Sequence, residues 1–249
     1  MKTVLITGAT ENTGLAIAKR FAADGYNIAL TSRNKAKAAI AAAEISSQYK
    51  CKTAGYAFNF TEQSTVTLFE KVREDFKELH TLVLNAADLA VDFGILNTTA
   101  ADFDRICAVN LKGNFLCCQQ AARLMLKTGG SIVIVGSVHH RETIDGRAVY
   151  SLCKGGLYSL SCAMAVELGR YNIRSNYISC GAIHTNRWDA LTPQQVAEKR
   201  TRYPLGVEST GEDIAQAAFY LGTDLSKTVT GTELTVDSGI GCCLLPYKK

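Results

Sequence analysis

The chain has 249 residues, of which 47% are hydrophobic and 20% charged, and its formal net charge is +4. This composition is ordinary for a soluble globular protein with a buried core, and the lack of an apolar run of about 18 residues argues against a membrane span. The small, dispersed positive charge suits an anionic cofactor. No basic block or aromatic-basic stripe is present, which argues against a nucleic-acid partner.

Short apolar runs alternate with longer amphipathic segments along the chain. This α/β alternation predicts one domain, 1–249, built on a doubly wound parallel sheet of about seven strands with helices on both faces. Runs such as 4–6 and 132–135 are apolar throughout, which is typical of strands covered on both faces. Strands are expected at 4–7, 26–31, 53–58, 82–84, 131–135, 173–178 and 233–236, and helices at 13–23, 35–49, 64–78, 102–126, 149–170 and 214–221.

One long irregular stretch, about 184–210, contains Trp188, Pro193 and Pro204. Ordered loops of this length in compact domains are usually functional. We therefore expect a partly helical lid over a substrate.

Nine cysteines are spread along the chain without a Cys-x-x-Cys pair, and the four histidines lack zinc-finger spacing. We interpret the cysteines as reduced thiols that act as small apolar residues, so neither a metal site nor a disulfide framework is expected. The apolar stretch at the N-terminus is too short for a signal peptide, and a cytoplasmic location is expected.

The first expected strand leads into a glycine-containing loop, Thr7 to Gly14, that precedes a helix. Strand, loop and helix in this order are the context of a dinucleotide loop, in which the helix N-terminus holds a pyrophosphate. Gly8 would permit the tight turn and Gly14 close helix-strand packing. A simple turn would explain two glycines about as well.

Tyr150 and Lys154 lie four residues apart in an expected helix, so the phenol and the ammonium share one face. The cation favours the phenolate and would let the tyrosine exchange a proton near neutral pH. Ser137, after the preceding strand, could hydrogen-bond the same substrate oxygen. Taken singly, these residues could equally be a surface pair and a strand-end hydroxyl.

Taken together, these motifs resemble the short-chain dehydrogenase/reductase family of the Tyr-x-x-x-Lys type over essentially the whole chain. The resemblance implies a Rossmann-like fold, an NAD or NADP cofactor, and hydride transfer between the nicotinamide and a small-molecule carbonyl or alcohol. The segments that carry it are Thr7-Gly8 with Gly14, Asn85-Ala86-Ala87, Asn110, Ser137, Tyr150 with Lys154, 180–185, and 230–239.

The resemblance also assigns roles. Tyr150 would be the acid in reduction and the base in oxidation, Lys154 would bind the nicotinamide ribose, Ser137 would hold the substrate oxygen, and Asn110 would anchor a water of a proton relay. The implied cofactor-binding residues are Gly8, Thr10, Asn12, Thr13, Gly14, Arg33, Asn59, Phe60, Asn85, Ala86, Ala87, Tyr150, Lys154, Gly181, Ile183 and Thr185.

The chain departs from the family pattern at several cofactor-loop positions. Asn12 replaces the middle glycine, Cys180 a proline, Asn59 an adenine-capping aspartate, and Ala87 a glycine. These changes motivate an alternative, a dinucleotide-binding sensor without turnover. None of them removes a group needed for proton or hydride transfer, so an enzyme is the leading hypothesis.

The end of the second strand indicates which cofactor is used. An NAD enzyme usually offers an acid there, but this chain has Ser32 followed by Arg33, a pair that suits a 2′-phosphate. Lys35 and Lys37 would strengthen the positive electrostatic field at this site, whereas Glu11 opposes it. NADP is therefore favoured over NAD.

The substrate is less defined. His139, His140 and Trp188 are candidates to line its pocket. Polar rings with an aromatic platform suit a sugar, a polyol or a small hydroxy-ketone, whereas a wide apolar lid would admit a steroid or 3-oxoacyl chain. By resemblance we also expect a homo-oligomer, a tetramer or a dimer, formed through the helices at 102–126 and 149–170.

Overall fold

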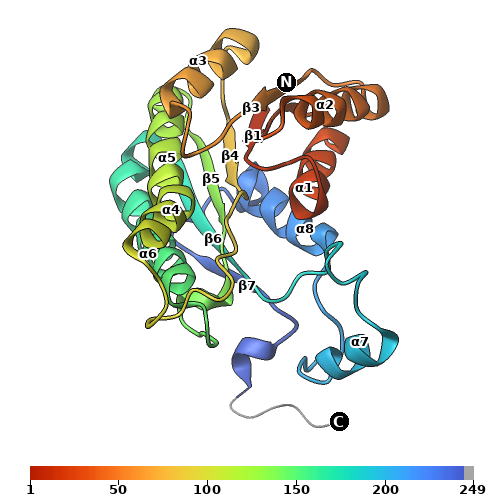
Figure 1. Cartoon of the computed structure of the whole chain (residues 1–249). Helices are drawn as coiled ribbons and strands as arrows, with labels where there is room; N and C mark the ends of the chain where they lie inside the picture. The colour runs from red at the N-terminus through yellow and green to blue at the C-terminus, as the bar shows by residue number, and fades with distance from the viewer. Residues whose placement is uncertain (244–249) are drawn as a thin grey trace.

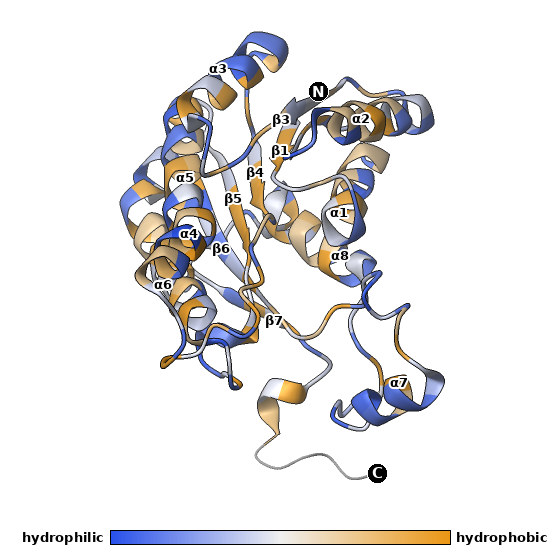
Figure 2. Cartoon of the chain, viewed as in Figure 1, coloured by the Kyte–Doolittle hydropathy of each residue, from blue (hydrophilic) through white to orange (hydrophobic). Residues whose placement is uncertain are grey.

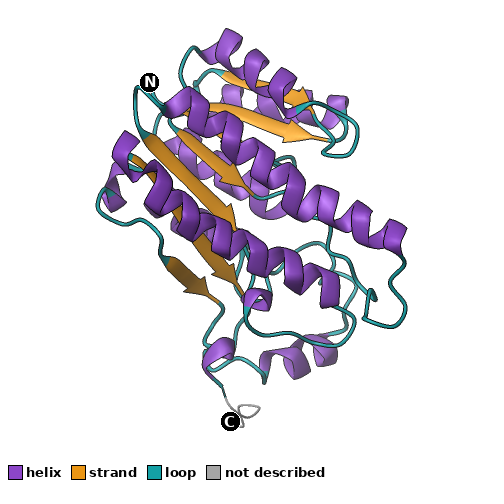
Figure 3. Cartoon of the chain, turned by 90° about the vertical axis from the view of Figure 1, so that its left-hand side faces the viewer, coloured by secondary structure: helices purple, strands orange, loops and turns teal. Residues whose placement is uncertain are grey.

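The computed structural model describes residues 1–243; the tail 244–249, for which the sequence suggests no role, lies outside them. Seven parallel strands form one sheet in the order β3-β2-β1-β4-β5-β6-β7 (Figure 3). The strand order reverses between β1 and β4, so a crevice opens at the carboxyl ends of these strands. The strands are β1 (Thr3–Ile6), β2 (Asn27–Ser32), β3 (Thr53–Ala57), β4 (Thr81–Leu84), β5 (Gly130–Val135), β6 (Ile173–Cys180) and β7 (Glu233–Val236).

Helices cover both faces of the sheet, as the alternation predicted (Figure 1). One layer contains α1 (Asn12–Ala23), α2 (Lys35–Tyr49) and α8 (Gly211–Gly222); the other contains α3 (Thr65–Phe76), α4 (Ala100–Cys107), α5 (Gly113–Met125) and α6 (Ala148–Leu168).

The core lies on both sides of the sheet, where apolar strands run between the helix layers (Figure 2). Successive side chains of a strand point to opposite faces. Val4 and Ile6 accordingly pack in the α1/α2/α8 layer, while Leu5 packs in the other. Both faces of β1 are therefore buried, which explains the apolar run 4–6.

The expected single helix at 102–126 is wrong in one respect. A π-helical turn, Ala108–Lys112, separates α4 from α5, and α4 begins earlier, behind a capping box of Thr99 and Asp102. Short π segments widen a helix locally and often occur at functional sites. This one contains the buried Asn110.

The stretch 184–210 contains one regular helix, α7 (Pro193–Arg200), which lies below α8 in Figure 1. Thr192 and Gln195 form a capping box at its start, and Pro193 occupies the first helical turn. None of the helices within residues 1–243 is long and apolar enough to cross a membrane.

A glycine in β3 sets how closely α2 approaches the sheet. A Cβ on Gly55 would lie 2.2 Å from the carbonyl oxygen of Ala38, a backbone atom that cannot rotate away. We expect Gly55→Ala to lower the free energy of unfolding by about 1–3 kcal/mol, measured by denaturant unfolding.

Gly169 offers the matched control, because nothing lies within 4 Å of a Cβ there and its φ is −55°. Gly169→Ala should be neutral or stabilise by up to about 1 kcal/mol. Equal effects of the two substitutions would contradict this account of α2 packing.

Candidate active site

The loop between β1 and α1 is bonded to the end of β4. Thr7 Oγ1 accepts hydrogen bonds from the backbone amides of Asn85 (3.0 Å) and Ala86 (3.1 Å), and Asn85 Nδ2 donates to the carbonyl of Gly8 (2.9 Å). A Cβ on Gly14 would lie 2.2 Å from the same carbonyl, so only glycine fits there. The loops 7–14 and 85–87 thus lie together at the switch point, where dinucleotides bind in such sheets.

Asn12 adopts a backbone conformation that usually favours glycine. Its φ is +48°, in the left-handed region that asparagine tolerates better than most residues. Its side chain also reaches the stretch 184–210, because Oδ1 accepts from the amide of Asn186 at 3.3 Å. The amides that begin α1 therefore keep the arrangement that can hold a pyrophosphate.

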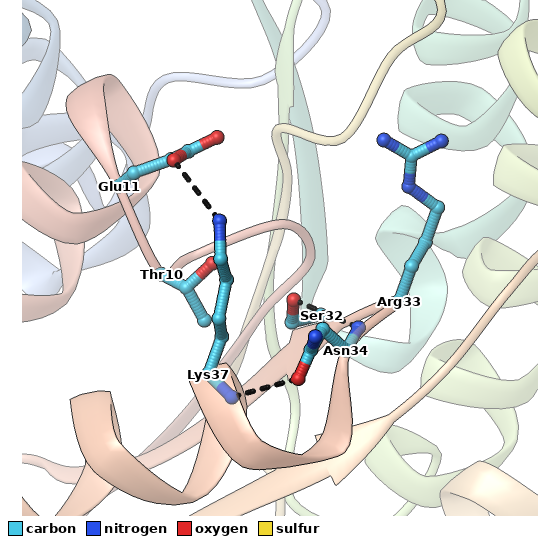
Figure 4. A pocket seen from close by; sticks show the side chains of 6 residues that line it. All are labelled: Thr10, Glu11, Ser32, Arg33, Asn34 and Lys37. Carbon is cyan, nitrogen blue, oxygen red and sulfur yellow. Dashed lines mark hydrogen bonds and ion pairs between the residues drawn. The ribbon is translucent and has the colours of Figure 1, made fainter.

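A polar hollow of about 320 Å³ lies at the end of β2 (Figure 4). The only carboxylate among its lining residues is Glu11, whose Oε2 lies 3.9 Å from Lys37 Nζ. Arg33 and Lys37 extend on either side of Ser32 in Figure 4. The side chains that line it are those of Thr10, Glu11, Ser32, Arg33, Asn34 and Lys37.

Asn59 and Phe60 follow β3, which is the neighbour of β2 in the sheet. Asn59 Oδ1 accepts from the amide and the hydroxyl of Thr61, so its side chain caps a local turn. Phe60 packs edge-on against Phe58 and lies over Gly113, where a Cβ would approach within 2.2 Å of its ring.

Ser137, at the end of β5, is fixed by a tyrosine that the sequence analysis did not identify. The buried hydroxyl of Tyr177 accepts from the Ser137 amide (2.9 Å) and donates to the Ser137 carbonyl (3.1 Å). Burial raises the pKa of Tyr177, so its phenol stays protonated. Gly136 permits this approach, since a Cβ there would lie 1.9 Å from the ring. The only sequence signal for the contact between Tyr177 and Ser137 was a tyrosine inside a buried strand.

Helix α6 brings Tyr150 and Lys154 to the same region, and both are buried. Lys154 Nζ donates to the carbonyl of Val135 (3.1 Å) and lies 5.5 Å from the centre of the Tyr150 ring. Burying an ammonium with so few partners is costly. Such a group is therefore a candidate for function rather than for stability.

Asn110, in the π turn, holds the loop after β4. Its Oδ1 accepts from the Asp88 amide (2.8 Å) and its Nδ2 donates to the Asp88 carbonyl (2.7 Å). Both ends of this side chain thus hold the loop, and the Asn110 backbone carbonyl accepts from Asn114 Nδ2 at 3.1 Å. The role in a proton relay that the resemblance implies stays a prediction.

The two histidines after Ser137 point in different directions. The His139 ring lies 5.8 Å from the Tyr150 ring, edge to face, which keeps it a candidate substrate contact. His140 does not fit that expectation. Its side chain is 1% exposed, packs against Tyr158 and Tyr177, and lies 3.2 Å from the Glu233 carboxylate.

The segment 181–185 continues from β6 into the stretch 184–210. Ile183 pairs with Ser209 through a β-bridge, and Gly181 sits so close to Asp237 that a Cβ would lie 2.8 Å from its Cα. Thr185 is half-buried and precedes Asn186, the partner of Asn12.

A charged cluster ties this segment to α7. Glu208 accepts two hydrogen bonds from Arg200 (2.7 and 2.8 Å) and lies 2.9 Å from His184 Nδ1. The Arg200 bonds lower the pKa of Glu208 to about 2, so this carboxylate is ionised at neutral pH. Trp188 stacks on His184 with 5.4 Å between the ring centres and lies next to Lys199.

Comparisons with known proteins agree with this arrangement. A sequence family described as enoyl-(acyl carrier protein) reductase matches residues 8–241. An uncharacterized oxidoreductase of Bacillus subtilis, YxbG, is 32% identical, covering 99% of this chain and 93% of its own length. The 3-oxoacyl-(acyl-carrier-protein) reductase of Bos taurus is 33% identical, over 96% and 98%. The crystal structure of a short-chain type dehydrogenase/reductase from Mycobacterium marinum has a TM-score of 0.89 at 28% identity, over 97% and 96%.

Strand order, loop position and relatives thus define one class of protein, the oxidoreductases that use a nicotinamide dinucleotide. Within that class, the chain belongs to the short-chain dehydrogenase/reductase family and is an NAD(P)-dependent dehydrogenase/reductase. The resemblance inferred from its motifs is confirmed.

The contact between Tyr177 and Ser137 generates a prediction. Tyr177→Phe leaves the buried Ser137 amide without its partner, so we expect the free energy of unfolding to fall by about 1–3 kcal/mol. Tyr220→Phe is the control, because Tyr220 is exposed and its hydroxyl has no hydrogen-bond partner among residues 1–243. That variant should stay within about 0.5 kcal/mol of wild type. Equal stabilities of the two variants would contradict the assigned bonds.

Proposed function

We propose that this enzyme transfers hydride between NADP and a carbonyl or secondary alcohol on a small polar molecule. The observation that carries the proposal is the buried pair of Tyr150 and Lys154 on α6, next to the strand end that carries Ser137. A buried ammonium beside a phenol is an arrangement suited to proton transfer.

In the reductive direction, Tyr150 gives its proton to the carbonyl oxygen, and in oxidation it takes the proton from the alcohol. The Ser137 hydroxyl holds the same oxygen. The ammonium of Lys154 lies on the same helix face, where it would hold the cofactor ribose and balance the negative charge left when Tyr150 gives up its proton. When bound, the nicotinamide supplies or accepts the hydride, and the protein supplies position and electrostatics.

The residues around the dinucleotide crevice fit such a cofactor. Gly8 (φ +64°) and Asn12 provide the turn, and Gly14 allows the start of α1 to approach. The remaining proposed contacts come from the loops at the carboxyl ends of the strands, namely Thr10, Thr13, Asn59, Phe60, Asn85, Ala86, Ala87, Gly181, Ile183 and Thr185.

NADP is proposed over NAD because the hollow at the end of β2 contains two cations. Arg33 and Lys37 line it, and Ser32 stands where a carboxylate would repel a 2′-phosphate. Glu11 opposes this preference, but its carboxylate already faces Lys37. Since both side chains are largely exposed, that pair is weak and a phosphate can displace it.

Two groups of rings support a small polar substrate. His139 lies near Tyr150, and Trp188 stacks on His184 in the stretch 184–210. We propose that 184–210 covers the substrate, with the Glu208 cluster holding α7 in place. A second candidate substrate is a 3-oxoacyl thioester, favoured by the reductase of Bos taurus. Acetoacetyl-CoA and hydroxyacetone, assayed in parallel, distinguish the two.

We further infer a cytoplasmic homo-oligomer, a dimer or tetramer formed through α4, α5 and α6. Exposed apolar side chains support this interface: Phe103, Phe115 and Leu152 are each more than 40% exposed. An adjoining hollow of about 480 Å³ lies between α4 and α6. All nine cysteines are unpaired, which fits a reducing compartment.

Tyr150→Phe tests the assigned acid. Removing the proton donor should lower kcat by about 10²–10⁴-fold while NADPH binding, followed by fluorescence, is retained. Tyr158→Phe, on the same helix, is the matched control and should keep turnover. Full activity of the Tyr150 variant would refute the assignment. If the wild type oxidises NADPH with no member of a carbonyl panel, the binding-only alternative holds instead.

Arg33→Gln tests the cofactor preference. It should reduce kcat/KM for NADPH by about 10–100-fold and leave that for NADH nearly unchanged, because only NADPH carries the 2′-phosphate. Lys35→Gln is the control, since Lys35 does not line the hollow. A loss shared equally by both cofactors would contradict the proposal.

A further inference from the structure

Tyr150 has a second cation beside it that the proposed chemistry does not use. Arg147 lies three residues ahead of it, directly before α6, and its guanidinium carbon is 5.5 Å from the centre of the Tyr150 ring. Lys154, four residues after it, lies at the same distance from that centre. Positions three before and four after a helical residue share its face, so both cations flank the phenol.

The backbone around Arg147 is held firmly. Gly146, with φ +72°, packs against Asp92, and its carbonyl accepts from the amide of Phe93 at 3.1 Å. The guanidinium Nη1 donates to the carbonyl of Leu89. The side chain therefore bridges the turn before α6 and the loop after β4, beside the Tyr150 ring.

Arg147 makes fewer polar contacts than the other half-buried arginines of residues 1–243. Arg200 makes two bonds to a carboxylate, Arg20 contacts Asp24 and Gln216, and Arg174 bonds to three oxygens. Arg147 has one partner, a neutral carbonyl, and no carboxylate within 4.0 Å among these residues. A guanidinium offers five donors. Most of its donors and its whole charge are thus available next to the Tyr150 ring.

We propose that Arg147 binds a carboxylate of the substrate, so that the enzyme reduces small oxo acids to hydroxy acids. This inference rests on the proposed function and narrows its substrate class. The carbonyl carbon takes a hydride from NADPH and its oxygen takes the Tyr150 proton, giving the hydroxy acid and NADP⁺. A carboxylate matches the planar fork of a guanidinium in a charge-assisted two-point contact, whereas a neutral sugar or ester lacks the negative charge.

The experiment compares each oxo acid with its neutral methyl ester: pyruvate, acetoacetate and levulinate, which place the carboxylate at three distances from the carbonyl. With NADPH, wild type should prefer at least one acid over its ester by about 10-fold or more in kcat/KM. Arg147→Gln should remove that preference by slowing the acid, with the ester changed less than about 3-fold. Arg147→Lys should restore part of it, since it keeps charge but loses the fork.

Arg170→Gln is the matched control, because Arg170 also lies over a tyrosine, Tyr171, in the turn just after α6. It should leave the acid preference unchanged. If Arg147 only holds the loop at Leu89 in place, Arg147→Gln will lower kcat/KM equally for the acid and the ester, and the proposal is overturned. The proposal also fails if wild type reduces neutral carbonyls without preferring any acid.

A binding measurement separates this inference from the proposed function. Tyr150→Phe loaded with NADPH should be stabilised against heat by the preferred acid but not by its ester, and adding Arg147→Gln should abolish that shift. If this binding is seen but no carbonyl is reduced by wild type, the carboxylate site stands and the proposed reaction falls. If neither binding nor reduction is seen, both fall.

Discussion

Thr7 holds the ends of β1 and β4 together where the strand order reverses, and the rest of the site follows from that contact. Its buried hydroxyl accepts from two successive amides after β4, which places the glycine loop beside residues 85–87. Asn110 then fixes the next stretch of that loop through both ends of its amide. The crevice is thus lined by backbone groups whose positions are set by buried hydrogen bonds rather than by surface charge.

Buried hydrogen bonds also fix Ser137 and Lys154, two of the proposed catalytic residues. Tyr177 fixes the Ser137 backbone from inside the sheet, and the carbonyl of Val135 receives the Lys154 ammonium. The ring of Tyr150 then has His139, Arg147 and Lys154 as its basic neighbours. Arg147 and Lys154 place two positive charges beside this ring, which suits an anionic group on a bound molecule.

The fold could be predicted from periodicity because buried parallel strands and amphipathic helices leave strong patterns; α2 and β7 begin and end at the residues expected. The break at 108–112 was not predictable, since a π turn keeps an amphipathic pattern. The orientation of His140 and the bond from Tyr177 to Ser137 were missed for another reason. Each depends on contacts between residues distant in sequence, and local motifs carry no such information.

The departures from the family pattern bear on whether the chain is a catalyst or only binds a dinucleotide. Asn12 adopts the left-handed conformation of the glycine it replaces, and burial raises the pKa of Cys180 to about 12, which keeps it a neutral thiol. Asn12 therefore keeps the turn of the cofactor loop, and Cys180 adds no charge at the end of β6. Lys154, in contrast, is a buried ammonium with a single carbonyl partner, an arrangement that costs stability. In the proposed function this cost is offset in two ways, because the ammonium can bind the cofactor ribose and can assist proton transfer at the Tyr150 phenol on the same helix face. Only the second of these roles is specific to a catalyst.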